Sequence, residues 1–255
     1  ASDVYKRQDF VDACERNGIV FIGPSSQIMN AMGDKISSKK MAIDAQVPII
    51  PGVDYAIKDI DTATKIAAEV GFPIMLKASN GGGGRGMRIV NTMEDLEKEF
   101  NEAKNESKKA FGDDKIFIEK YLRAPKHIEV QILGDNYGNV VHLYERECSI
   151  QRRNQKVIEE SPSPFVKEET RKKMLKVAVE ACKKIGYYSA GTLEFMMDKD
   201  QNFYFLEMNT RLQVEHPVTE ECTGVDLVRD MITVAAGNPL PYKQDDIEFS
   251  GAAIE

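Results

Sequence analysis

A run of glycines between two strand-like segments is the strongest chemical signal in the sequence. Gly81, Gly83 and Gly86 satisfy the pattern GxGxxG, but a dinucleotide site of that type needs a helix directly after its glycines. Residues 87–90, Met-Arg-Ile-Val, favour a strand instead, so the context predicts a flexible hairpin flap whose backbone N–H groups can approach phosphate oxygens closely. Lys77, at the end of the preceding strand, supplies a point charge for a phosphate. A solvated turn is the alternative.

Two glutamates in consecutive strand-like segments form a second chemical pattern. A four-residue turn after Asp198 would pair Asp198 with Phe203 and place Glu194 opposite Glu207 on one face of a hairpin. Like charges opposite each other destabilise a sheet, and a divalent cation between them reverses that effect. Asn209 would face the same side and add a neutral oxygen, which completes a ligand set for Mg²⁺ or Mn²⁺ rather than Zn²⁺. The alternative is two exposed carboxylates in a different register.

Two strings of polar residues accompany this hairpin. Residues 209–217, Asn-Thr-Arg-Leu-Gln-Val-Glu-His-Pro, are too rich in charge for a core segment. Within them Arg211 can bind an anion with two N–H groups, and Glu215 can act as a general base. Residues 149–156 form the second string. A solvated loop and an exposed basic strand, respectively, are the alternatives.

The elements that must hold these residues alternate between helices and strands. Apolar periodicity with capping and stop signals predicts helices near residues 10–18, 61–71, 92–112, 168–185 and 225–236, the second of them capped by Asp61. Residues rich in β-formers predict strands at 18–23, 72–78, 116–122, 127–133, 192–198 and 203–208.

Composition excludes several classes of protein. The 255 residues are 42% hydrophobic and 29% charged, which is typical of a globular chain and not of a disordered or collagen-like one. A net charge of −7 provides no broad basic surface, so we expect no nucleic-acid partner. The four scattered cysteines, without a CxxC pair, predict reduced thiols. Without a long apolar run or a signal peptide in residues 1–8, we expect a cytoplasmic protein with no membrane partner.

Four stretches taken together strongly resemble biotin carboxylase, the ATP-grasp component of acetyl-CoA carboxylase and its relatives. They are Lys77-Ala-Ser-Asn-Gly-Gly-Gly-Gly-Arg-Gly-Met87, Glu119-Lys-Tyr-Leu122, Glu147-Cys-Ser-Ile-Gln-Arg-Arg-Asn-Gln-Lys156 and Glu207-Met-Asn-Thr-Arg-Leu-Gln-Val-Glu-His-Pro-Val-Thr-Glu220. The resemblance extends over about residues 10–255. Its long motifs occur in the order found in the family, which makes it far more specific than any single match.

The resemblance implies a mixed fold, α+β or α/β: an ATP-grasp domain with a flexible glycine-rich hairpin lid, preceded by the tail of a Rossmann-like pre-ATP-grasp domain. The tail would occupy residues 1–33 and the ATP-grasp domain residues 34–255. Within the latter, we expect a lid subdomain at about 49–121 and an incomplete C-terminal subdomain at 122–255. Residues 1–8 fit the family poorly, and the chain stops before a downstream arginine of the family. We therefore expect a chain truncated at both ends and impaired in turnover.

The implied reaction is the ATP-dependent carboxylation of biotin. ATP phosphorylates bicarbonate to carboxyphosphate, which yields CO₂ for the ureido N1 of biotin on a biotin carboxyl carrier protein. This is the first half-reaction of acetyl-CoA carboxylase in fatty acid biosynthesis, and it implies Mg²⁺ or Mn²⁺, a carboxyltransferase component and a homodimer. The alternatives are a non-catalytic MgATP-binding fragment, the corresponding domain of a pyruvate or propionyl-CoA carboxylase, and another ATP-grasp ligase.

The resemblance also implies roles for individual residues. ATP would be bound by Lys35, Lys77, Gly83, Gly84, Glu119, Lys120, Tyr121, Leu122, His127, Gln151, Asn154, Met196, Glu194 and Glu207. Bicarbonate would be bound by Lys156, Arg211, Gln213, Val214 and Glu215, and the metal by Glu194, Glu207 and Asn209. The catalytic residues would be Lys156, Arg211 and Glu215, with Glu215 as the base. Asn154 stands where many family members have histidine, which affects the expected contact to a ribose hydroxyl.

Overall fold

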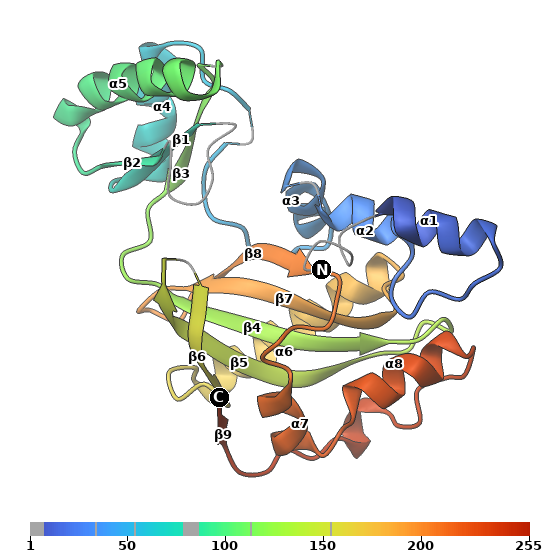
Figure 1. Ribbon diagram of the computed structural model, residues 1–255. Helices are drawn as coiled ribbons and strands as arrows, with labels where there is room; N and C mark the ends of the chain where they lie inside the picture. Colours follow the sequence, from blue (N-terminus) through green and yellow to red (C-terminus); the bar gives the residue numbers. More distant parts are fainter. Residues whose placement is uncertain (1–7, 34, 54, 79–86, 113, 154) are drawn as a thin grey trace. The chain divides into compact units, whose positions relative to one another are not determined.

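The computed structural model describes residues 8–33, 35–53, 55–78, 87–112, 114–153 and 155–255 (Figure 1). The chain divides into two compact units. One combines Ala1–Ile49 with Pro125–Glu255, and the other is Ile50–Ala124. The assignment of residues 1–33 to a separate domain stays a prediction. None of the described helices combines the length and apolar character that a membrane span requires.

The Ile50–Ala124 unit is a small antiparallel sheet covered by two helices. It contains α4 (Ile60–Val70), β1 (Ile74–Ala78), β2 (Met87–Val90), α5 (Met93–Phe111) and β3 (Ile116–Lys120), with strand order β2-β1-β3. Alternate residues of β1, including Ile74 and Leu76, are buried against apolar residues of both helices. The pairing of Ile74 with Val90 and of Lys77 with Met87 confirms the predicted hairpin. Residues 79–86, which include Gly83 and Gly84, lie outside the described part of the chain.

The start of α4 differs from the sequence-based expectation. The N-cap is Asp59 rather than Asp61, and its carboxylate accepts the N–H of Thr62 at 2.8 Å. Asp61 lies in the first turn, where its negative charge still favours the positive end of the helix dipole. Asp59 has the extended backbone that a cap requires, with φ −140°. Gly71 ends the helix as predicted, with φ +75°.

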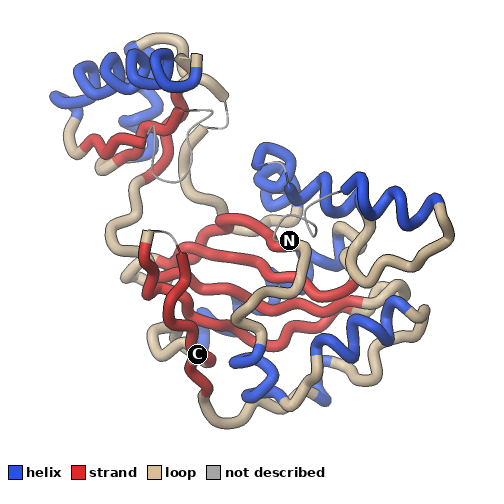
Figure 2. The backbone as a smooth tube through the Cα atoms, viewed as in Figure 1, coloured by secondary structure: helices blue, strands red, loops and turns tan. Residues whose placement is uncertain are grey.

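The other unit is built on a six-stranded antiparallel sheet, shown in red in Figure 2. Its order is β8-β7-β4-β5-β6-β9. The strands are β4 (Lys126–Gly134), β5 (Val140–Arg152), β6 (Gln155–Ser161), β7 (Ser189–Met197), β8 (Phe203–Asn209) and β9 (Ala253–Ile254). The helices are α1 (Gln8–Arg16), α2 (Ser26–Gly33), α3 (Lys35–Asp44), α6 (Glu168–Lys184), α7 (Pro217–Thr223) and α8 (Leu227–Ala235), with a 3₁₀ turn at Gln244–Asp246.

The two faces of this sheet have different chemistry. Ile128, Val130 and Phe195 belong to a buried apolar cluster that includes Met174 and Ala178 of α6, and Figure 1 shows α6 against that face. Because successive side chains of a strand point to opposite sides, the residues between these apolar ones face away from α6. They include the buried polar residues Glu129, Gln131 and Glu194, which form the floor of the candidate site.

The predicted strand at residues 18–23 is wrong. These residues follow α1 as irregular chain, and Ile19 and Val20 are 60% and 67% exposed. A strand is stabilised by hydrogen bonds to a neighbour, and no strand in the described part of the chain pairs with this segment. Local β propensity alone was therefore insufficient.

Candidate active site

Four charged residues lie side by side across the sheet. The register pairs Glu207 of β8 with Glu194 of β7, Glu194 with Glu129 of β4, and Glu129 with Arg146 of β5. Paired residues of antiparallel strands point to the same face, so three carboxylates and one guanidinium form a row over four strands. Glu129 and Arg146 are fully buried, Glu194 is 4% exposed, and Glu207 is exposed.

The predicted pairing of Glu194 with Glu207 is confirmed, although the register at the turn differs. Phe203 pairs with Met197 and not with Asp198. A register shift between Glu194 and Phe195 then leaves an extra residue on β8, which makes Leu206 a bulge. Phe205 consequently packs in the core while Glu207 returns to the polar face. The sequence pattern does not reveal the bulge, because one extra residue in a strand leaves no compositional signal.

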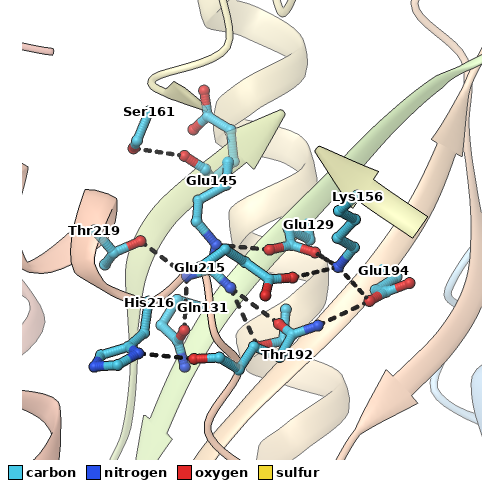
Figure 3. A network of polar contacts seen from close by, with 12 residues as sticks. Glu129, Gln131, Glu145, Lys156, Ser161, Thr192, Glu194, Glu215, His216 and Thr219 are labelled. Atoms are coloured by element: carbon cyan, nitrogen blue, oxygen red, sulfur yellow. Dashed lines mark hydrogen bonds and ion pairs between the residues drawn. The ribbon is translucent and has the colours of Figure 1, made fainter. Parts of the chain in front are cut away.

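Lys156, the second residue of β6, contacts three carboxylates. Its Nζ lies 2.8 Å from Oε1 of Glu194 and 2.5 Å from Oε1 of Glu215, and it also donates to Oε2 of Glu129. Figure 3 shows the Lys156 ammonium among these three side chains. The acids come from β4, β7 and the polar string after β8, so Lys156 holds together residues that are far apart in the sequence.

The protonation states of this cluster follow from burial and pairing. Burial acts to lower the pKa of Lys156, but the carboxylates of Glu129 and Glu194 outweigh it and raise that pKa. Burial acts to raise the pKa of Glu194, but hydrogen bonding to His127 and the charge of Lys156 lower it to about 2. Lys156 similarly lowers the pKa of Glu215 against the effect of burial. At neutral pH Glu194 and Glu215 are therefore ionised and Lys156 is charged.

The donor set fits a hard divalent cation. Ligand atoms of His127, Glu129 and Glu194 lie within 4.8 Å of one another. The Nδ2 of Asn209 donates to Glu194 at 2.8 Å, which places that predicted ligand beside the acid. The buried cluster contains three glutamates, which contact Lys156, and two basic residues, Lys156 and Arg146. Its side chains therefore have a formal net charge of −1. Carboxylate oxygens with a net negative charge suit Mg²⁺ or Mn²⁺.

The polar string between β8 and α7 delivers the expected bicarbonate residues to the same region. Gln213 is buried and its Nε2 donates to Oε1 of Glu194 at 2.9 Å. Glu215 is 7% exposed and faces Lys156. Arg211 donates to the carbonyl of Leu212 at 3.3 Å, and Val214 is 81% exposed. Lys156 thus contacts Glu215 directly and is linked to Gln213 through Glu194, while the binding of bicarbonate by these residues stays a prediction.

Several residues predicted to bind ATP lie in the Ile50–Ala124 unit. Lys77 and Glu119 form an ion pair between β1 and β3. The Nζ of Lys120 donates to the carbonyls of Gly71 and Phe72, at 2.8 and 2.9 Å, so this side chain holds the end of α4. Tyr121 donates its backbone N–H to Pro73, and Leu122 follows it directly. Their contacts to a nucleotide stay predictions.

The remaining predicted ATP residues are placed as follows. His127 pairs with Met196 on the polar face of the sheet, and His127 Nε2 lies 3.0 Å from Oε2 of Glu194. Gln151 is exposed at the end of β5, and its Nε2 donates to the carbonyl of Cys148 at 2.9 Å. Asn154 and the side chain of Lys35 lie outside the described part of the chain.

Sequence reasoning missed Glu129 and Arg146. Glu129 is a single charged residue between apolar neighbours, in Ile128-Glu129-Val130, whereas Arg146 lies between two other charged residues, Glu145 and Glu147. A charge in an otherwise apolar strand must find a partner, since an unpaired buried charge is costly. That signal was present, but it does not identify the partner, because the neighbours of a strand depend on the topology of the whole sheet.

Comparison with known proteins agrees with this geometry. Residues 34–243 match the family "Carbamoyl-phosphate synthase L chain, ATP binding domain". The chain is 56% identical to the propionyl-CoA carboxylase alpha chain of Ruegeria pomeroyi over 96% of its own length and 36% of that protein. It is 53% identical to biotin carboxylase 2 of Bacillus subtilis over 96% of its own length and 55% of that protein. The chain thus spans between about a third and about half of these relatives.

Solved structures give the same result. The biotin carboxylase domain of Hydrogenobacter thermophilus 2-oxoglutarate carboxylase, in complex with MgADP, ADP and bicarbonate, aligns with a TM-score of 0.83 at 52% identity, over 98% of this chain and 55% of that one. Campylobacter jejuni biotin carboxylase in a β-γ-ATP complex aligns with a TM-score of 0.84 at 50% identity, over 98% and 56%. The expected ATP-grasp fold is confirmed. The chain belongs to the carbamoyl-phosphate synthase L chain ATP-binding domain family, and within it the resemblance to biotin carboxylase is confirmed.

Proposed function

We propose that this chain is the ATP- and bicarbonate-handling part of a biotin carboxylase, a ligase that carboxylates biotin on a carrier protein through carboxyphosphate. The observation that carries the proposal is the cluster of Glu129, Glu194 and Glu215 around Lys156. The identity to relatives named biotin carboxylase supports it further. So does a structural neighbour that holds MgADP and bicarbonate.

The carboxylate row would hold the divalent cation that accompanies ATP. Glu194 and Glu207 lie opposite each other, and Asn209 contacts Glu194. When bound, such a cation neutralises charge on the phosphates during phosphoryl transfer. The residues of the chain supply the remaining functions, which are to orient the anion and to move a proton.

Lys156, Arg211 and Gln213 would bind bicarbonate, and Glu215 would accept its proton. Lys156 and Arg211 provide positive charge, while Gln213 provides an amide donor. Glu215 is ionised at neutral pH because Lys156 lowers its pKa. An anion in the site would compete with Glu215 for the Lys156 ammonium. A weaker ion pair with Lys156 would raise the pKa of Glu215, and so make it a stronger base, when the proton of bicarbonate must be removed.

The test is ATP hydrolysis with and without bicarbonate, in the presence of Mg²⁺ and free biotin. We expect bicarbonate to stimulate phosphate release, and Glu215→Gln and Arg211→Ala to lower the stimulated rate at least 100-fold. Glu169→Gln is the matched control, since Glu169 is an exposed acid of α6 paired with Lys173. Rates indifferent to the two site variants would refute these roles. Stimulation by a different carboxylate in place of bicarbonate would favour another ATP-grasp ligase.

The identity of the parent carboxylase is a finer proposal. Acetyl-CoA carboxylase, and with it fatty acid biosynthesis, was the first expectation, and relatives include propionyl-CoA, 2-oxoglutarate and pyruvate carboxylases. We propose a biotin carboxyl carrier protein and a carboxyltransferase as partners, a homodimer as the assembly, and the cytoplasm as the compartment. The four free, buried cysteines fit a reducing compartment.

A further inference from the structure

Arg146 is the most completely bonded side chain of the site, and none of the roles above includes it. It is fully buried on β5. Its Nε donates to Oε1 of Glu129 at 2.6 Å. Its two terminal nitrogens reach the following oxygens: Oε1 of Gln131 at 2.7 Å, Oγ1 of Thr219 at 2.9 Å, Oε1 of Gln213 at 3.0 Å and Oγ1 of Thr192 at 3.5 Å. The five N–H groups of the guanidinium thus face five acceptors.

These contacts fix the orientation of two side-chain amides. Because arginine can only donate hydrogen bonds, the atom of each glutamine that faces Arg146 must be the oxygen. The NH₂ group of Gln213 is therefore turned away from Arg146 and toward Glu194. The NH₂ group of Gln131 is directed to the carbonyls of Ile132 and Gly191 instead. Of the two glutamines, Gln213 is the one whose NH₂ group faces the carboxylate cluster.

Arg146 also links the sheet to the segment that carries the anion-binding residues. Its hydrogen bonds to Glu129 and Thr192 reach β4 and β7 of the sheet. Its hydrogen bonds to Gln213 and Thr219 reach the polar string and α7. The string therefore cannot move relative to the sheet floor without breaking hydrogen bonds to a buried charge, which is costly.

We propose that Arg146 is a positioning residue that directs the NH₂ group of Gln213 into the bicarbonate site. This inference rests on the proposed function. Lysine cannot take over the role: its ammonium can pair with Glu129, but it lacks the planar fork that reaches Gln131 and Gln213 at once. Without that fork, the Gln213 amide is free to turn its oxygen toward the anion, and a carbonyl oxygen repels bicarbonate.

The same strand provides a matched control. Glu145, the neighbour of Arg146, points to the other face, where Nε of Arg171 donates to its Oε1 at 2.8 Å. Glu145 is fully buried, as Glu129 is. Arg171→Lys therefore disturbs an equivalent arginine–glutamate pair in the same unit without touching the site.

The experiment compares Arg146→Lys, Gln213→Ala, the double variant and Arg171→Lys in bicarbonate-stimulated ATP hydrolysis. We expect Arg146→Lys and Gln213→Ala each to raise the KM for bicarbonate about 10-fold, with the KM for ATP changed less than 2-fold. The double variant should match Gln213→Ala alone, because Arg146 acts through Gln213. Arg171→Lys should leave both KM values unchanged. An unchanged bicarbonate KM in folded Arg146→Lys, or additive effects in the double variant, would overturn the inference.

A second measurement serves if Arg146→Lys fails to fold. In the unmodified chain, the side-chain NH₂ resonances of Gln213 and Gln131 are followed by NMR while bicarbonate is added. The Gln213 signals should shift and the Gln131 signals should not, since only the former amide faces the site. Absence of a Gln213 shift would overturn the inference. A chain whose ATP hydrolysis ignores bicarbonate altogether would instead refute the proposed function.

Discussion

Glu194 and Glu207 lie directly opposite each other on β7 and β8, on the sheet face that also carries Glu129. Two like charges in that arrangement repel each other, and a cation bound between them would remove the repulsion. Protonation of Glu194 does not remove this repulsion, because the pKa of Glu194 is lowered to about 2 and its carboxylate is ionised at neutral pH. The arrangement thus predicts how the protein responds to metal ions.

Divalent cation binding should depend on both acids. We expect Glu194→Gln and Glu207→Gln each to raise the Kd for Mn²⁺, measured by EPR in the presence of ATP, at least 10-fold, since each removes a full charge from the ligand set. Asp200→Asn is the control, because Asp200 is an exposed acid in the turn of the same hairpin. Equal Mn²⁺ affinity in all three variants would exclude the proposed metal site.

Removal of Lys156 should destabilise the protein in a way that Mg²⁺ corrects. Lys156→Met leaves three buried carboxylates without their shared cation, which should lower the free energy of unfolding by about 3 kcal/mol. Mg²⁺ should then stabilise the variant more than the unmodified chain in urea denaturation. Lys126→Met is the control: Lys126 pairs with buried Glu147 on the other face, so its loss should not be corrected by Mg²⁺. Equal Mg²⁺ effects would contradict this account.

The side chain of Lys120 should stabilise α4. Since its Nζ bonds the carbonyls of Gly71 and Phe72, Lys120→Met should cost about 1–2 kcal/mol and speed hydrogen exchange in the last turn of that helix. Lys65→Met, on the exposed side of α4, should leave exchange unchanged. If Lys120→Met weakened ATP binding but left exchange as it was, the side chain would act on the nucleotide instead.

His142 should make stability depend on pH. Burial lowers the pKa of His142 from 6.5 to about 4 in the folded protein, and its Nδ1 accepts the N–H of Tyr144 at 3.4 Å. Between pH 4 and pH 6.5, His142 of the unfolded chain therefore binds a proton that His142 of the folded protein does not. The contribution of His142 is therefore complete above pH 6.5 and is lost as the pH falls toward 4, by on the order of 3 kcal/mol in total.

The check is urea denaturation at pH 7 and pH 5 for the unmodified chain and His142→Gln. The variant cannot take up this proton, so the difference in unfolding free energy between the two pH values should shrink. An identical pH dependence in both proteins would show that His142 does not titrate as its burial implies.

The sequence was sufficient where structure is decided locally. Apolar period predicted α5 and α6. The pairing of Glu194 with Glu207 was predicted from a four-residue turn, and it holds because the bulge at Leu206 offsets the different register at that turn. The glycine-flanking strands β1 and β2 were likewise predicted as a hairpin. In each case the partners are close in sequence or the pattern is long, so few alternatives compete.

The sequence was insufficient where partners come from distant segments. Arg146 meets Gln213 and Thr219 only because β5 lies beside β4 and under the polar string, an arrangement that no local pattern encodes. The bulge at Leu206, which places Phe205 in the core, leaves no signal in the local sequence either. Conversely, the apolar run from Ile19 to Ile22 looks like a strand but has no strand partner in the described residues.

The most direct test of the central claim is phosphate release from MgATP with and without bicarbonate, in the unmodified chain and in Glu215→Gln. We predict that bicarbonate stimulates release in the former, and that Glu215→Gln removes the stimulation while the variant still binds MgATP. Release that is unaffected by bicarbonate, or stimulation that survives in Glu215→Gln, would contradict the account.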